Sequence, residues 1–236
     1  MTKAWKEAWF STGVRVKRAN LWRGVEAQHV VSTMRLADNA AEQRVLEELL
    51  EASKPALPAE AAGRHYLVFT PFRYRSPFAS RFRRPHEPGV WYGAEELKTA
   101  CAEVGYWKWR FLVDSDALRD SALHTEHTFF QARVRGRCAD LVAAPWKAAT
   151  RAWTQNTDYS QTQAFGAEAR EHGLGWIRYS SVRVADGLCA AVLGPEALSL
   201  ADPFEQQTWA CKTTASGAWL QRAGGGRFDF PADGWR

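Results

Sequence analysis

The amino-acid sequence predicts a mixed α+β fold in one domain. Segments with strand and helix patterns follow one another without the regular β-α-β-α alternation of a doubly wound sheet. The chain has 236 residues, of which 46% are hydrophobic, so it is long enough to bury a sizeable core. Neither an internal repeat nor a long linker divides it, which favours one domain with additions over two small ones.

Charge and cysteine content limit the functions that fit the chain. The net charge of +5 is compatible with an anionic small ligand, an acidic protein partner or weak nucleic-acid contact. No signal-peptide pattern and no apolar run long enough to span a bilayer is visible, so we expect a cytoplasmic protein. No two cysteines form a CxxC pair, so we expect free, buried thiols rather than a zinc knuckle. The cysteines are Cys101, Cys138, Cys189 and Cys211.

The first part of the chain combines strand and helix patterns. Residues 21–36 predict a short strand and its connection. Residues 39–52 predict a helix, because Asn39 followed by Glu42 is a capping-box pattern. The apolar stripe of this helix consists of Val45, Leu46, Leu49 and Leu50. Residues 65–70 are nearly all apolar and rich in types that favour strands, so they predict a buried strand.

The middle of the chain predicts a loop, a strand–helix pair and a long extended segment. Residues 71–88 are rich in proline and arginine and predict a loop. Residues 89–94 predict a short strand that runs into a helix over about 95–108. Residues 125–135 predict a strand, and residues 138–144 another strand or its continuation.

The last part of the chain predicts a helix over 158–171 and two hairpins. The strands of the first hairpin are expected over 175–182 and 188–193, and the second hairpin over 206–222. The tail from Gly224 is glycine-rich and is expected to be mobile. Its glycine run neither follows a convincing strand nor opens a helix, so no Rossmann site or P-loop is expected.

The loop over residues 72–84 is the first candidate site. Its arginines can bind phosphate oxygens in pairs, and their alternation with aromatic residues also suits single-stranded nucleic acid. A solvated loop with its aromatic side chains in the core explains the pattern as well, so the choice stays open. The arginines are Arg73, Arg75, Arg81, Arg83 and Arg84.

Glu103 is the second candidate. On the predicted helix, Ala100 and Val104 belong to the buried stripe, and Glu103 lies beside it, about 60° from Ala100. A carboxylate there can point along the floor of a cleft. The pattern alone fits an ordinary glutamate on a helix surface somewhat better.

The remaining polar patterns are weaker. Ser180 and Ser181 would face opposite sides of a strand, so one of them could donate to a ligand, although a structural serine fits the pattern better. His124 and His127 stand three apart in an extended stretch and would face opposite ways, which argues against a metal site. No HExxH or GxSxG motif occurs.

Taken in order, these segments resemble the RES domain, a family named for its arginine, glutamate and serine. The matching segments are Trp22-Arg23, Ser80-Arg81-Phe82, Tyr92-Gly93-Ala94, Thr99-Ala100-Cys101-Ala102-Glu103 and Tyr179-Ser180-Ser181-Val182-Arg183. The resemblance covers roughly residues 20–195. We therefore assign one RES-type domain over 1–236, whose C-terminal extension, 196–236, has no functional interpretation.

Two departures from the family pattern matter. Ser80 stands where the family has glycine, so Arg83 could take the role of Arg81. Ser180 stands where the family has proline, so the family serine is matched with Ser181.

The resemblance implies a fold and an activity. RES proteins fold like diphtheria-type ADP-ribosyltransferases, with a split, strongly curved β core, flanking helices and a cleft for NAD⁺. Family activities are NAD⁺ hydrolysis, NAD⁺ phosphorolysis and ADP-ribosylation of a protein. Many members are toxins that pair with an Xre-type antitoxin, through which alone nucleic acid would be contacted. A homodimer is compatible with the family pattern, and NAD⁺ as substrate without a metal or a membrane is expected.

The resemblance also implies residue roles. Glu103 would stabilise the positive charge that develops on ribose as nicotinamide leaves. Arg23 and Arg81 would hold the pyrophosphate. Tyr92 would stack on or edge the nicotinamide ring, and Ser181 would bond the ribose or its phosphate.

These roles predict an NAD⁺ glycohydrolase or phosphorylase that acts as the toxin of a toxin–antitoxin pair. A protein ADP-ribosyltransferase is the alternative within the same family. The alternative of another class is a non-enzymatic nucleic-acid-binding protein that uses the Arg73–Arg84 loop, and it predicts strongly salt-dependent binding.

Overall fold

The two longest strands of the sheet are antiparallel and pair with each other. β1 (Val14–Glu26) pairs with β3 (Leu123–Asp140) along its whole length in the computed structural model, which describes residues 2–27, 34 and 36–235. The other strands are β2 (Trp91–Ala94), β4 (Trp176–Ser180), β5 (Leu188–Val192), β6 (Leu198–Ser199), β7 (Gln206–Thr214), β8 (Gly217–Gln221) and β9 (Arg227–Pro231). The helices are α1 (Ala8–Thr12), α2 (Ala40–Ser53), α3 (Tyr66–Arg73), α4 (Leu97–Val113), α5 (Thr150–Trp153) and α6 (Ser160–Glu171).

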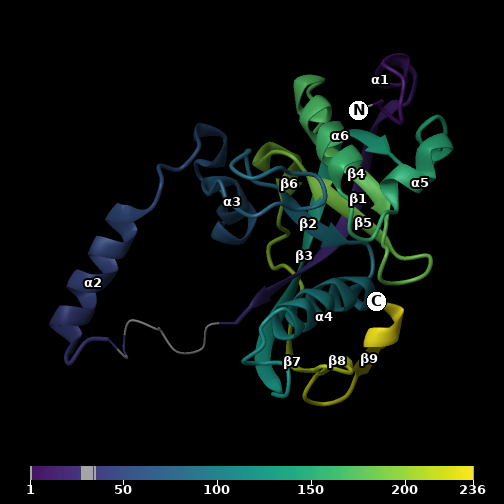
Figure 1. Ribbon diagram of the computed structural model, residues 1–236. Helices are drawn as coiled ribbons and strands as arrows, with labels where there is room; N and C mark the ends of the chain where they lie inside the picture. Colours follow the sequence, from purple (N-terminus) through teal and green to yellow (C-terminus); the bar gives the residue numbers. More distant parts are fainter. Residues whose placement is uncertain (1, 28–33, 35, 236) are drawn as a thin grey trace.

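Five of the strands pair with one another in a closed ring. β1 pairs with β2, β2 with β5, β5 with β4, β4 with β3, and β3 with β1 again. We call these strands the closed sheet. The first half of β3 also pairs with β7, which continues into β8 and β9, and residues 123–126 of β3 lie beyond the pairing with β1. The sheet is therefore split and strongly curved, with helices around it, as predicted (Figure 1).

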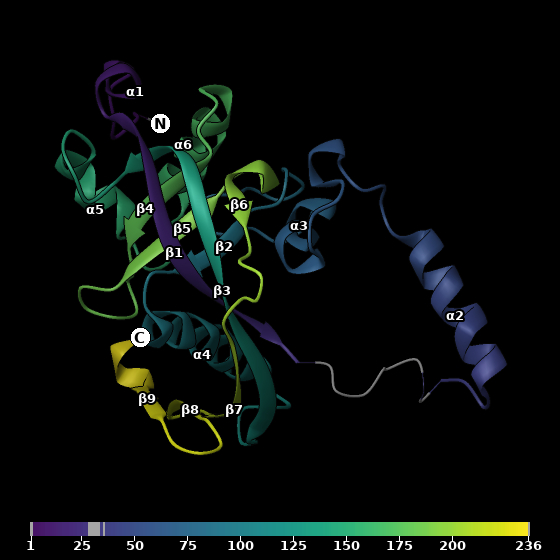
Figure 2. The same ribbon diagram turned by 180° about the vertical axis from the view of Figure 1, so that it is seen from behind.

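Helix α4 lies between the two parts of the sheet. It contacts β1, β2 and β5 of the closed sheet and also β7, β8 and β9 (Figures 1 and 2). Small residues on the helix permit this close packing, because a side chain at Gly105 would come within 3.2 Å of Ala218 in β8. The helix is thus held on several sides, and any side chain it presents to a cavity is held with it.

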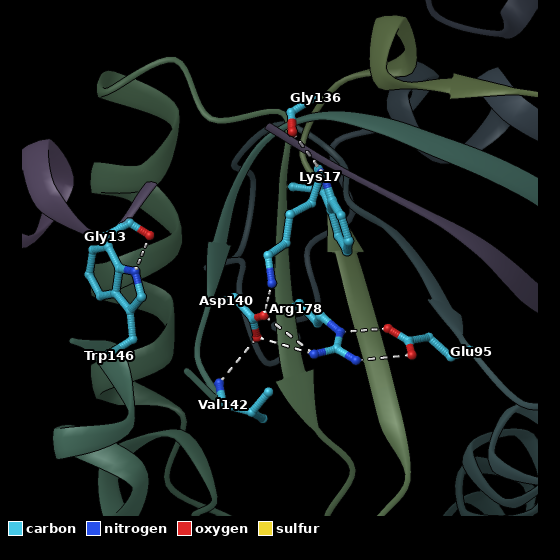
Figure 3. Close-up of polar contacts among 9 residues, drawn as sticks. Gly13, Lys17, Glu95, Gly136, Asp140, Val142, Trp146 and Arg178 are labelled. Carbon is cyan, nitrogen blue, oxygen red and sulfur yellow. Dashed lines mark hydrogen bonds and ion pairs between the residues drawn. The ribbon is translucent and has the colours of Figure 1, made fainter. Parts of the chain in front are cut away.

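A charged network fixes the start of α4 (Figure 3). Arg178 in β4 donates from Nε to Glu95 Oε1 at 2.6 Å and from Nη2 to Glu95 Oε2 at 3.1 Å, and from Nη1 to Asp140 at the end of β3. Lys17 in β1 also pairs with Asp140. Since Glu95 stands between β2 and α4, this bidentate pair ties the helix start to the closed sheet.

The segment predicted as a buried strand at 65–70 is instead part of α3, so that prediction is wrong. His65 caps the helix by accepting at Nδ1 from the backbone N–H of Leu67, 3.2 Å away. Pro71 lacks the N–H that would bond to the Leu67 carbonyl, and this carbonyl accepts from the indole of Trp91 instead. Only one side of the segment is buried, as is usual for a helix on the surface of a domain. The apolar run in the sequence did not indicate this one-sided burial.

The N-terminal extended segment and α2 differ from expectation in other ways. β1 begins at Val14, earlier than predicted, and residues 28–33 and 35 of the predicted connection lie outside the described residues. The capping box of α2 is confirmed, with Asn39 Oδ1 accepting from the backbone N–H of Glu42 at 3.0 Å. Yet α2 stands apart from the closed sheet (Figure 2) and has no buried residue, so its apolar stripe is not packed into the core.

Residues 224–235 are an ordered part of the fold, so the prediction of a mobile tail is wrong for them. Gly224, Gly225 and Gly226 all have positive φ and form the turn between β8 and β9. Beyond β9, the indole of Trp235 packs against Tyr106 and Trp109 of α4. The other predicted helices and hairpins are confirmed, 138–144 begins as the continuation of β3, and the four cysteines are free and buried.

Candidate functional site

A cavity of about 380 Å³ lies between α4 and the closed sheet. Four of the five residues predicted for the site line it, and they are Arg23, Arg81, Tyr92 and Glu103. Ser181 is not a lining residue, but its hydroxyl bonds to Glu103. The structure thus brings together residues that are far apart in the sequence.

One stripe of α4 forms a wall of the cavity. The lining residues of this stripe are Ala100, Glu103, Val104, Trp107 and Lys108. They follow the i, i+3, i+4, i+7, i+8 spacing of a single helix face. β1 approaches this face closely because Gly24 has no side chain, and a Cβ there would lie 2.8 Å from Val104.

Glu103 is held from the side of β4 and β5. Its Oε1 accepts a hydrogen bond from the Ser181 hydroxyl at 2.8 Å and a weak one from the Cys189 thiol at 3.8 Å. Ser181 Oγ in turn accepts from the backbone N–H groups of Arg183 and Val184. Among the described residues Oε2 of Glu103 has no hydrogen-bond partner. The carboxylate is therefore oriented through one oxygen and offers the other to the cavity.

Tyr92 in β2 lines the same cavity as Glu103 and is fixed through its hydroxyl. Its Oη is 2.8 Å from Ser80 Oγ and accepts from the backbone N–H of Phe82 at 3.0 Å. Burial raises the pKa of the Tyr92 phenol, so the hydroxyl stays protonated at neutral pH. With the hydroxyl held by the loop, the aromatic ring is the part of Tyr92 that is available to a ligand.

Arg81 is a buried arginine that lies on the cavity wall. Its Nη1 donates to the carbonyls of Trp153 and Gln155, and its guanidinium lies over the ring of Tyr159 at 4.7 Å. Helix α6 presses against this loop through Gly166, where a Cβ would be 2.3 Å from the Phe82 carbonyl oxygen. These contacts fix the position of a positive charge on the wall opposite α4.

Arg23 lies between this cavity and a neighbouring groove. It lines both, and its Nη1 donates to the Tyr92 carbonyl at 2.9 Å. Its Nε is buried without a hydrogen-bond partner among the described residues. Burial lowers the pKa of Arg23 to about 10, so the guanidinium is still charged at neutral pH and keeps donors for an anion.

Comparison with protein families bears on what such a cavity does. A family model described as "RES domain" matches residues 57–214, about two thirds of the chain. The chain belongs to the RES domain family. The match includes Arg81, Tyr92, Glu103 and Ser181 of this RES protein, whereas Arg23 lies before its start.

The fold is also similar to that of a solved structure. A chain in the crystal structure of the M. tuberculosis MbcT–MbcA toxin–antitoxin complex is 15% identical to this RES protein. The similarity covers 89% of this chain and 94% of that one, with a TM-score of 0.48. No curated protein matches the sequence.

The arginine-rich loop of the RES protein is not a free basic surface. Arg81 and Arg83 are buried, and Arg83 donates to the carbonyls of Ser76 and Phe78 rather than lining the cavity. Arg73 pairs with Glu51 and Arg84 with Glu87. Of the two candidates for a phosphate-binding arginine, Arg81 is the one on the cavity wall, and the loop offers little unpaired charge to nucleic acid.

Several residues that line the cavity were not predicted from the sequence. Arg183 lines the cavity with its guanidinium 3.4 Å from the ring centre of Tyr106, and it is the arginine of the late family segment, so the motif could have indicated it. Tyr179 is the first residue of that same segment, whereas Tyr159 carries no pattern that separates it from core residues. His127 also lines the cavity, although its pattern was weighed only for metal binding.

Two other expectations concern metals and membranes. His127 is buried and His124 is exposed, so the two histidines face opposite ways as predicted. No group of three His, Cys, Asp or Glu side chains that could hold a metal ion occurs in residues 2–27, 34 and 36–235. In that same part of the chain, no helix has the length and apolar character needed to cross a bilayer.

Proposed function

We propose that this RES protein cleaves the bond between nicotinamide and ribose in NAD⁺. The observation that carries the proposal is the oriented carboxylate of Glu103 in a cavity that also holds the guanidinium groups of Arg23 and Arg81. A carboxylate and separate positive charges in one cavity suit a substrate with a cationic reacting end and an anionic pyrophosphate. The buried, unpartnered Nε of Arg23 is compatible with a bound anion at that wall.

The charge of each residue determines its role in the proposed reaction. When the bond from ribose C1′ to the pyridinium nitrogen breaks, its electron pair goes to nitrogen and nicotinamide leaves as a neutral molecule. The sugar then carries positive charge, which the Glu103 carboxylate stabilises more strongly than it stabilises the ground state. Arg23 and Arg81 bind the pyrophosphate, and the ring of Tyr92 packs against the nicotinamide.

Ser181 acts through Glu103 in this proposal. The sequence suggested that it bonds the ribose or its phosphate, but its hydroxyl is used by Glu103 and by the loop that follows β4. Orientation of a catalytic group by a neighbouring hydrogen bond is a common way to fix its geometry. We therefore infer that Ser181 is a positioning residue.

Three acceptors of the ADP-ribosyl group are compatible with this proposal. Attack by water releases a proton and gives ADP-ribose, phosphate gives an ADP-ribose phosphate ester at C1, and a protein side chain gives a modified protein. The resemblance to RES toxins supports the further proposal that an Xre-type antitoxin binds this protein and covers the cavity mouth. A nucleic-acid-binding function is disfavoured, because two of the five arginines in the loop it needs are buried and two are ion-paired, while Arg75 is exposed.

We expect purified, folded protein without an antitoxin to consume NAD⁺ and release nicotinamide. The measurement is product identification by liquid chromatography and mass spectrometry, with phosphate present or absent. ADP-ribose in both cases indicates a hydrolase, and a phosphate-dependent ester indicates a phosphorylase. Unchanged NAD⁺ after long incubation would contradict the proposal.

Arg81→Lys is expected to raise the KM for NAD⁺ about 10- to 100-fold and to change kcat much less. Lysine keeps the charge but loses the fork that bonds two phosphate oxygens, and a hydrogen bond to a charged group contributes about 1.5–3 kcal/mol. Arg84→Ala is the matched control, because Arg84 is exposed and pairs with Glu87 outside the cavity. Equal KM values in wild type and Arg81→Lys would remove Arg81 from substrate binding.

A further inference from the structure

His127 is a buried side chain of the cavity wall that the proposed reaction leaves unused. It is 2% exposed and lines the cavity together with Trp107, Lys108 and Glu26. Lys108 pairs with Glu26, which is the register partner of His127 across β1 and β3. Lys108 is five residues beyond Glu103 on α4, or about 7.5 Å along the helix axis. His127 thus belongs to a different part of the cavity from the reacting carboxylate.

The hydrogen bonds of His127 leave one nitrogen for a ligand. Its Nε2 lies 2.9 Å from Thr125 Oγ1, which holds the ring in place. Its Nδ1 is buried and has no hydrogen-bond partner among the described residues. A buried polar atom without a partner is unfavourable, so such atoms are normally satisfied. Since His127 lines the cavity, an occupant of the cavity can supply the missing partner.

The surroundings of His127 favour an uncharged group on that occupant. Burial, together with the positive charge of Lys108, lowers the pKa of His127 to about 4, while Glu26 acts in the opposite direction. The imidazole is therefore neutral at pH 7, and the Lys108–Glu26 pair adds no net charge. The aromatic ring of Trp107, half exposed at the same part of the cavity, offers a flat apolar face. A neutral hydrogen-bonding group beside an aromatic surface suits a heteroaromatic ring rather than a phosphate.

We propose that His127 is a specificity-determining residue, and that its Nδ1 hydrogen-bonds an uncharged group on one of the two heteroaromatic rings of the dinucleotide. This inference rests on the proposed function, because it takes NAD⁺ as the occupant. Both rings carry an uncharged N–H donor, in the carboxamide of nicotinamide and in the amino group of adenine. Thr125 is a positioning residue that holds the imidazole through Nε2.

Two amide substitutions test the roles of the two ring nitrogens of His127 separately. In His127→Asn the amide group stands near the place of Nδ1, and in His127→Gln it stands near the place of Nε2. His127→Gln is expected to raise the KM for NAD⁺ about tenfold, the effect of one lost hydrogen bond, with kcat within about threefold. His127→Asn is expected to recover most of this loss. His124→Asn, exposed on the same strand, is the control and should match wild type.

Two substrate analogues identify the ring. The 3-acetylpyridine analogue of NAD⁺ removes the amide donor, and nicotinamide hypoxanthine dinucleotide reverses the hydrogen-bonding edge of adenine. Wild type should lose about tenfold in kcat/KM with one of them, and His127→Gln should show no further loss with that same analogue. If His127→Gln does not fold, Thr125→Val provides a second test. Valine keeps the shape of threonine but loses the hydrogen bond to His127, so this variant should also raise the KM for NAD⁺.

The outcomes distinguish this inference from the proposed function. If wild type cleaves NAD⁺ and the folded His127 and Thr125 variants keep its KM and its analogue preferences, the role of His127 is overturned while the function stands. If wild type neither binds nor cleaves NAD⁺, the proposed function fails and the inference fails with it.

Discussion

Glu103→Gln is expected to lower the rate of NAD⁺ cleavage about 10²- to 10³-fold, which is the usual effect of losing one preorganised electrostatic group in an active site. Glutamine keeps the shape of glutamate and can still accept the Ser181 hydrogen bond at 2.8 Å, so the fold should be unaffected. The KM should change much less than kcat, because the negative charge matters most when the sugar carries positive charge. Initial rates over a range of NAD⁺ concentrations give both parameters.

The matched control is Glu96→Gln on the same helix. Glu96 is exposed at the N-cap of α4, and its side chain makes no capping hydrogen bond. Its substitution should leave turnover intact and change the free energy of unfolding by at most about 0.5 kcal/mol. A folded Glu103→Gln protein with the turnover of wild type would exclude Glu103 from the mechanism and leave the proposed chemistry without its central residue.

Phe165→Ala is expected to lower the free energy of unfolding by about 3–5 kcal/mol, the usual cost of removing a fully buried phenylalanine. Phe165 in α6 is completely buried, and its ring contacts those of Trp5, Phe10, Trp146 and Trp153. The alanine would leave a cavity that these rigid rings cannot fill. Thermal or urea denaturation followed by tryptophan fluorescence measures the loss, and we expect the Tm to fall by roughly 10 °C.

The same substitution tests how the aromatic cluster supports the site. The Trp153 carbonyl accepts from Arg81, so a looser cluster should also raise the KM for NAD⁺ at temperatures where the variant is folded. Phe111→Ala is the control, because Phe111 is 62% exposed and should change stability little. Unchanged stability of Phe165→Ala would mean that the cluster relaxes around the missing ring.

The parts of the site that could be predicted from sequence depend on local pattern. Glu103 could be placed beside a buried stripe from helical periodicity alone, and α4 presents it to the cavity. The distinction between Arg81 and Arg83 could not be made in this way. It depends on α6 packing through Gly166 against the backbone of the loop, which is a contact between segments far apart in the sequence.

The parts of the fold that escaped prediction have similar causes. The run over residues 65–70 is nearly all apolar, so periodicity could not separate a strand from a helix, and Pro71 argued against a helix that continues through it. The glycines at 224–226 suggested a mobile tail because the pairing of β9 with β8 is not visible in local sequence. His127 was missed because its importance comes from a missing partner, which only the folded arrangement reveals.

The closed sheet has a consequence for how the protein is made. A ribosome delivers β1, β2, β3 and β4 in that order, but β5 is the strand that joins β2 to β4, and it ends at Val192. The wall that carries Cys189 therefore does not exist until most of the chain has been translated, and local folding of earlier segments cannot replace it. If the protein cleaves NAD⁺, we therefore expect a nascent chain to be inactive until β5 has been translated and has paired with β2 and β4.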